Sequence, residues 1–200
     1  MDRPSRLLVL FLCTIALTSC GSKKKENSGP PRWTSLPVAI YADPAIVSSA
    51  ATHNDFNEAM AFWENRAGKK LFDFRGAWTG QLPPFNGDPN RPDALFGNVI
   101  YFERSWPFSQ NIAAQTIVFS QRSDLLSSVI MINSGAGLCV GNCVGNFGAS
   151  ERKVFAHELG HFLGLQHNSN SSDVMYPEVQ PGASLEGLQI DSAAFSQLIR

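Results

Sequence analysis

Eleven consecutive residues near the C-terminal end decide the fold, and they read HELGHFLGLQH from His157 to His167. Side chains four residues apart lie on one face of an α-helix, so His157 and His161 can present two imidazoles to one metal ion. Gly164 can adopt the left-handed conformation that ends a helix and turns the chain back, which brings His167 to the same point. The spacing therefore predicts a zinc site with three protein ligands and an open fourth position, the arrangement of catalytic zinc.

Glu158 projects from the flank of the histidine pair, near enough to reach a metal-bound water without replacing it. We interpret it as the general base of the site. The alternative is a buried helix whose histidines only satisfy core hydrogen bonds, because the segment is apolar on nearly all sides, with Val154, Phe155, Leu159, Phe162, Leu163 and Leu165. Three buried imidazoles and a carboxylate would each need a polar partner, and one metal ion with its water supplies most of them.

A methionine follows the last of these histidines by eight residues, within the segment Ser172-Asp173-Val174-Met175-Tyr176-Pro177. Here the chain resembles the metzincin metallopeptidases, most closely the matrixin branch, whose extended zinc motif precedes a methionine-containing turn beneath the metal. The resemblance implies that Met175 forms the floor of the metal site and that Tyr176 and Pro177 belong to the substrate pocket. In some metzincins a tyrosine two residues after the methionine reaches the zinc, but Pro177 occupies that place here.

The pattern of the remaining chain predicts an α+β domain. Apolar and β-branched runs indicate strands, and helical spacing with capping residues indicates helices. The expected strands are 36–41, 71–75, 98–102, 115–120 and 127–133, and the expected helices are 49–65 and a short one from Asp191 or Ser192 to about Ile199. This order is similar to a minimal matrixin catalytic domain, of α/β type. It implies a twisted, mostly parallel sheet with an N-terminal helix, the zinc-binding helix, the Met-turn and a C-terminal helix.

The N-terminus predicts export. Arg3 and Arg6 precede an apolar stretch from Leu7 to Leu17, as in a signal peptide. The following Leu17-Thr18-Ser19-Cys20 resembles a bacterial lipobox, which implies lipidation of Cys20; an ordinary secretory signal with an incidental cysteine is the alternative. We therefore expect a signal peptide over 1–19, a lipidated Cys20 with a flexible tether over 20–32, and a catalytic domain over 33–200. The resemblance implies the cell envelope, and the outer membrane where the host has one.

Two further cysteines remain in the exported part of the chain, Cys139 and Cys143. Outside the cytoplasm such a pair is usually a disulfide, and the short segment between them is flexible enough to close a small ring. We expect the disulfide to stiffen the glycine-rich segment that leads into the zinc helix. A metal-binding or redox-active pair is the alternative.

The expected cofactor is one catalytic zinc ion. Matrixins commonly hold a second, structural zinc with further histidines, but His53 is the only histidine outside the motif. Calcium is common in the family, and residues 86–90 (NGDPN) have oxygen ligands in a turn; they lack the spacing of a calcium loop, and ordinary turn chemistry explains them equally well. A net charge of −1 gives no reason to expect a nucleic-acid partner. We expect a monomer that takes a peptide or protein substrate and contacts the membrane through Cys20.

These observations favour a zinc-dependent endopeptidase tethered to the bacterial cell envelope. A non-catalytic, zinc-stabilised surface binding lipoprotein is the alternative. The intact Glu158 argues against the alternative, because binding alone does not need a general base.

Overall fold

The computed structural model describes residues 30–80, 97–141, 143, 149–179, 182 and 184–200. The predicted signal peptide, the lipidation site Cys20 and most of the tether lie outside the described residues. The turn at 86–90, considered above for calcium, also lies outside them.

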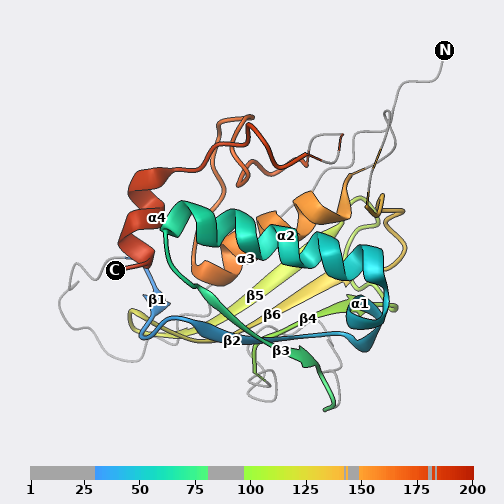
Figure 1. Cartoon of the computed structure of the whole chain (residues 1–200), viewed down its shortest axis with the longest axis horizontal. Coiled ribbons are helices and arrows are strands. Elements are labelled where there is room, and N and C mark those ends of the chain that lie inside the picture. Colours follow the sequence, from blue (N-terminus) through green and yellow to red (C-terminus); the bar gives the residue numbers. More distant parts are fainter. Residues whose placement is uncertain (1–29, 81–96, 142, 144–148, 180–181, 183) are drawn as a thin grey trace.

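A six-stranded sheet forms the base of the described fold (Figure 1). Its strand order is β1-β6-β4-β2-β3, with parallel pairing throughout, and β5 pairs antiparallel with β6. The strands are β1 (Arg32–Trp33), β2 (Val38–Ala42), β3 (Phe72–Ala77), β4 (Val99–Glu103), β5 (Ala114–Gln121) and β6 (Asp124–Asn133). The predicted α/β architecture with a mostly parallel sheet is confirmed, and β5 lies at one edge of the sheet.

Two long helices cover one face of this sheet, α2 (Ala50–Ala67) and α3 (Glu151–Leu163) (Figure 1). The Ser49 side chain caps α2 by accepting a hydrogen bond from the Thr52 N–H, and Gly68 ends it with a φ of 64°. The C-terminal helix α4 (Ser192–Leu198) starts at Asp191, whose carboxylate accepts the N–H groups of the first turn. These caps explain why both helices follow the predicted ranges.

Two short elements have no counterpart among those predicted, β1 and the helix α1 (Pro44–Ser48). Asp43 caps α1 and Pro44 opens it, which is a recognisable start signal, but five residues are too few to show helical periodicity. β1 is two residues long and exists only because it pairs with Asp124 and Leu125 of β6.

The main core lies between the sheet and the two long helices. Ile40, Ile100, Ile130 and Ile132 point from the strands toward α2 and α3, and all four are fully buried. The strand residues Val99, Tyr101, Val129 and Met131 belong to a second, smaller core, because successive strand residues alternate between the two faces. The sheet therefore packs apolar side chains on both faces, which is typical of parallel strands.

A buried ion pair ties α3 to α2 and to the loop before it. The Asp55 side chain on α2 is fully buried, and its Oδ1 accepts hydrogen bonds from Arg152 Nε at 2.9 Å and Nη2 at 2.7 Å. Its Oδ2 accepts the Gly141 N–H at 2.7 Å. Gly141 lies in the ring closed by the predicted Cys139–Cys143 disulfide, which the structure contains with an Sγ–Sγ distance of 2.06 Å. One carboxylate thus joins α2, the start of α3 and the disulfide ring.

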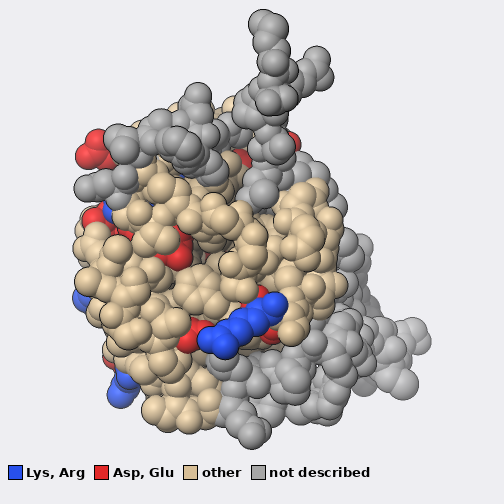
Figure 2. Space-filling view, turned by 90° about the vertical axis from the view of Figure 1, so that its right-hand side faces the viewer, with Lys and Arg blue, Asp and Glu red and all other residues tan. Residues whose placement is uncertain are grey.

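The surface is shown from one side in Figure 2. On the face drawn in Figure 2, basic and acidic side chains of the described residues lie next to each other within a larger uncharged area. Among the described helices, none combines the length and the apolar character needed to cross a membrane.

Replacement of Asp55 by alanine should strongly destabilise the fold. It would leave the Arg152 guanidinium, which is 13 % exposed, without its buried partner. Loss of one partner of a buried pair costs about 3–5 kcal/mol of unfolding free energy. Glu58→Ala is the matched control, because this carboxylate also pairs with Arg152 but its side chain is 45 % exposed, and about 1 kcal/mol or less is expected. Urea unfolding of both variants measures the difference; equal losses would contradict the assignment.

Candidate metal centre

Helix α3 carries the first two histidines and ends where the chain reverses toward the third. Its last turn closes at Gly164, which has a φ of 105° and donates its N–H to the carbonyls of Gly160 and His161. A Cβ at Gly164 would lie 2.7 Å from the Pro31 carbonyl oxygen, so both the backbone conformation and the available space require glycine. The chain then runs back over Leu165 and Gln166 to His167, as predicted.

The three histidine side chains converge. The His157 Nε2 atom lies 3.1 Å from His161 Nε2 and 3.2 Å from His167 Nε2. Ligands of a tetrahedral zinc at about 2.05 Å are about 3.3–3.4 Å apart. His157, His161 and His167 are the one group of metal-ligating side chains that comes together in the described part of the chain. The separations of the three nitrogens therefore fit a single zinc ion.

Backbone carbonyls set the tautomers of the two helical histidines. His157 Nδ1 lies 2.8 Å from the Val174 carbonyl oxygen, and His161 Nδ1 lies 2.7 Å from the Leu165 carbonyl oxygen. A carbonyl oxygen can only accept, so both Nδ1 atoms carry the proton and both Nε2 atoms present a lone pair. Two lone pairs 3.1 Å apart repel each other unless a cation lies between them. The donor set therefore fits a metal ion better than a core of hydrogen-bonded histidines.

Burial keeps these imidazoles neutral. His157 and His161 are each 1 % exposed. Burial lowers the pKa of His157 to about 4, with the Val174 carbonyl acting in the opposite direction. Burial also lowers the pKa of His161 well below its ordinary value and lowers the pKa of His167. Neutral imidazole is the form that binds metal, so the site is ready for an ion at neutral pH.

Glu158 is fully buried beside this group. Its Oε2 accepts a hydrogen bond from the Thr116 hydroxyl on β5, and its Oε1 has no hydrogen-bond partner among the described residues. Burial raises the pKa of Glu158 to about 8, and the Thr116 hydrogen bond opposes this shift. A bound metal cation would act against this burial effect, because its charge favours the ionised carboxylate, which is the form that accepts a proton. Thr116 is a site residue that the sequence analysis did not identify.

The predicted Met-turn lies directly beneath α3. A Cβ at Gly160 would overlap Met175 Sδ and would lie 2.8 Å from Trp63 Cζ2, so the helix approaches this methionine only because residue 160 is glycine. Asp173 orders the turn, since its Oδ1 accepts the Met175 N–H at 2.8 Å and its Oδ2 accepts the Asn168 Nδ2–H at 3.0 Å. The turn thus supports the helix and also fixes the segment that follows His167.

The remaining predicted site residues lie around this centre. Tyr176 and Glu178 line a small cavity together with Lys153 of α3. Pro177 lies between Tyr176 and Glu178 in the chain. Cys139 lies against the start of α3, where its carbonyl accepts the Glu151 N–H at 2.8 Å. His53 on α2 is half-buried and its ring packs against Phe74 at 5.7 Å, away from the metal-ligating group.

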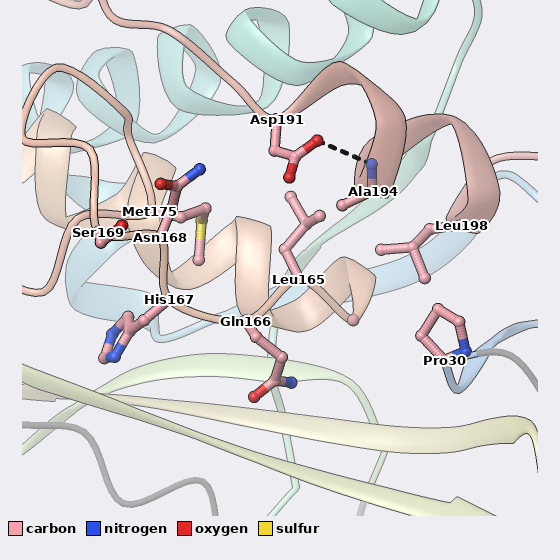
Figure 3. A pocket seen from close by; sticks show the side chains of 11 residues that line it. Pro30, Leu165, Gln166, His167, Asn168, Ser169, Met175, Asp191, Ala194 and Leu198 are labelled. Carbon is pink, nitrogen blue, oxygen red and sulfur yellow. Dashed lines mark hydrogen bonds between the residues drawn. The ribbon is translucent and has the colours of Figure 1, made fainter.

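A larger cavity of about 390 Å³ has the third histidine in its wall (Figure 3). His167 and Met175 line it on the side of the metal centre, and Leu165, Ala194 and Leu198 form its apolar wall. Asp191 also lines this cavity, but its carboxylate Oδ1 accepts the Ala193 and Ala194 N–H groups in the first turn of α4. The Asp191 Oδ1 atom therefore serves the helix cap.

A helix with two histidines, a glycine-ended return to a third, a buried glutamate and a methionine beneath them define the metzincin class of metallopeptidase site. The matrixin family model matches residues 52–198, and the chain belongs to this family, whose members use zinc.

Two curated relatives are similar to the chain. Karilysin of Tannerella forsythia is 24 % identical over an alignment of 198 residues, which covers 86 % of this chain and 36 % of the relative. Metalloendoproteinase 1-MMP of Arabidopsis thaliana is 46 % identical over 41 residues, which cover 20 % of this chain and 11 % of the relative. The chain thus spans about a third of the length of the first relative and about a tenth of the second.

Gly160→Ala should destabilise the protein through overpacking. The added methyl group overlaps Met175 Sδ, and displacement of a packed core side chain costs about 1–3 kcal/mol of unfolding free energy. Met175→Ala removes the obstructing thioether, so the double variant should lose less stability than the sum of the single variants. A double-mutant cycle by urea unfolding measures this coupling, and additive losses would show that the two residues do not compete for the same space.

Proposed function

We propose that this protein is a zinc-dependent endopeptidase, held at the bacterial cell envelope by a lipid on Cys20. The observation that carries the proposed activity is the convergence of three histidine nitrogens, two of them in a metal-binding tautomer, beside a fully buried glutamate. Membership of the matrixin family supports the same activity.

His157, His161 and His167 would hold the zinc through their Nε2 atoms. When bound, zinc supplies a Lewis acid that polarises the scissile carbonyl and lowers the pKa of a coordinated water to about 7. Glu158 accepts the proton of the attacking water at Oε1, the carboxylate oxygen to which no described residue donates a hydrogen bond. It then donates this proton to the leaving amine. The apolar surroundings of α3 exclude bulk water from this carboxylate, which strengthens its interaction with the transferred proton.

The edge strand β5 is the element best placed to bind an extended peptide. β5 pairs with β6 along one side, and no other strand of the described residues pairs with its second side. A peptide can add to such an edge through main-chain hydrogen bonds. β5 also packs against α3, and its Thr116 contacts Glu158 directly. A peptide on this edge would therefore lie next to the general base.

The proposed tether rests on the sequence. The lipobox-like segment Leu17 to Cys20 follows an apolar stretch of signal-peptide type, and the residues from Gly21 to Pro30 are polar and rich in lysine, serine and glycine. Such a linker would let a folded domain stand off a membrane surface.

Substitutions at Glu158 and His161 separate catalysis from metal binding. Purified protein should contain close to one zinc per chain. Glu158→Gln should retain this zinc and the fold, because Glu158 is not a ligand, while peptide hydrolysis falls by about 100- to 10,000-fold through loss of proton transfer. His161→Ala should lose the zinc. Metal analysis and cleavage of a mixed peptide library measure both effects.

Two outcomes would contradict the proposal. Undiminished cleavage by zinc-loaded Glu158→Gln would refute the mechanism. Inactivity of the zinc-loaded parent on every peptide would favour a binding protein.

Cys20→Ala tests the tether. In a bacterial host it should move the protein from the membrane fraction to the soluble fraction, or block processing of the signal peptide, because the lipid attachment site is gone. Fractionation followed by immunoblotting measures the partition, with Cys13→Ala as the matched control that removes another cysteine of the same N-terminal segment. Equal membrane partition of Cys20→Ala and the parent would refute lipidation at this residue.

A further inference from the structure

One hydrogen bond joins the edge strand to the catalytic helix through side chains. The Thr116 hydroxyl on β5 donates to Glu158 Oε2 on α3, across 42 positions of the sequence. Both residues are buried, with Thr116 2 % exposed and Glu158 fully buried. The Glu158 carboxylate therefore cannot exchange this partner for bulk water.

The geometry defines which oxygen of Glu158 is held and which is available. A threonine hydroxyl has a single proton, and donation to Oε2 uses it. The backbone carbonyl oxygen of Glu158 is 3.4 Å from the same hydroxyl, which is beyond the usual length of such a bond. Oε1 has no hydrogen-bond partner among the described residues. The two oxygens thus differ, because Oε2 is anchored to β5 and Oε1 keeps its lone pairs available to accept a proton.

Thr116 is itself rigidly placed. It lies within β5, paired with Ile130 of β6, and threonine is branched at Cβ, so few side-chain rotamers are available in a buried strand. The Glu158 side chain, which is unbranched at Cβ and rotates about three bonds, has several rotamers of its own. The rigid partner therefore restricts the flexible one, because a carboxylate rotated away from Thr116 would be buried without a donor.

We propose that Thr116 is a positioning residue that holds the Glu158 carboxylate in its productive rotamer and so links the peptide-binding edge of the sheet to the general base. This role rests on the proposed peptidase function. It predicts a loss in the rate of the chemical step with little change in substrate binding, because Thr116 acts through Glu158.

Three variants test this role. Thr116→Val keeps the shape and removes the hydroxyl, Thr116→Ser keeps the hydroxyl, and Ser128→Ala removes a different buried hydroxyl from the neighbouring strand β6. Each is purified with zinc and assayed for metal content, thermal unfolding, kcat and KM on a peptide that the parent cleaves. A hydrogen bond to an ionised group predicts a fall in kcat of about 10- to 100-fold in Thr116→Val, with zinc content retained and KM within about 2-fold.

The controls separate positioning from a structural role. Thr116→Ser should recover most of kcat, and Ser128→Ala should keep the parent kcat. In a Glu158→Gln background, Thr116→Val should change the residual rate by less than about 2-fold, because the group through which it acts is already lost. A parent-like kcat in Thr116→Val, a loss that Thr116→Ser does not recover, or loss of zinc would overturn the proposal.

Crystal structures of the zinc-loaded parent and of Thr116→Val provide a test that needs no activity. The Glu158 carboxylate should contact Thr116 in the parent and occupy a different rotamer in Thr116→Val. An unchanged rotamer would overturn the positioning role even if the parent cleaves no peptide, whereas a parent without activity but with a displaced carboxylate in the variant would overturn only the proposed peptidase function.

Discussion

The site depends first on two hydrogen bonds from histidine rings to backbone carbonyls. His157 Nδ1–H donates to Val174 O and His161 Nδ1–H donates to Leu165 O, and these bonds force both Nε2 lone pairs toward one point. Without them, burial alone would leave the ring orientation and the tautomer undetermined. Both carbonyls belong to segments that follow α3, so the metal centre forms only when the return loop and the Met-turn are docked against the helix.

This docking explains the two glycines within the zinc motif. Gly160 lets α3 approach Met175 and Trp63, and Gly164 lets the chain reverse against the Pro31 carbonyl. The Trp63 indole completes this contact by donating its Nε1–H to the Ala156 carbonyl at 2.8 Å, and the Trp33 indole donates in the same way to Phe162 at 2.8 Å. Helix α3 is thus held by neighbours on several sides, and rigid support of this kind preorganises a metal site.

Burial has a second consequence, because it makes the polar groups of the site depend on specific partners. The histidine nitrogens face one another, Glu158 depends on Thr116, and Asp55 depends on Arg152 and Gly141. The Glu158 and Asp55 contacts join segments 42 to 97 positions apart in the sequence. These contacts fix the edge strand to the zinc helix, and α2 to the start of that helix and the disulfide ring, inside an apolar core.

The sequence by itself determined the features that depend on local spacing. The spacing of the helical histidines and the glycine after them act over one or two helical turns, so the zinc helix and its ligands could be predicted. The caps at Ser49 and Asp191 are equally local, so the limits of α2 and α4 could be predicted as well. The longer strands were predicted to within a few residues, because alternation and β-branched content are also local.

Only the tertiary structure decided which distant groups meet. The sheet order, the two-residue strand β1, the edge position of β5 and the contact of Thr116 with Glu158 depend on strand pairing and helix packing across tens of residues. No spacing in the sequence identifies Thr116 as a site residue, because threonine is common in strands. Its role is visible only when the folded structure places its hydroxyl against a buried carboxylate. The physical reason is that a buried polar group selects its partner by proximity after packing, and proximity between remote segments is set by the whole fold.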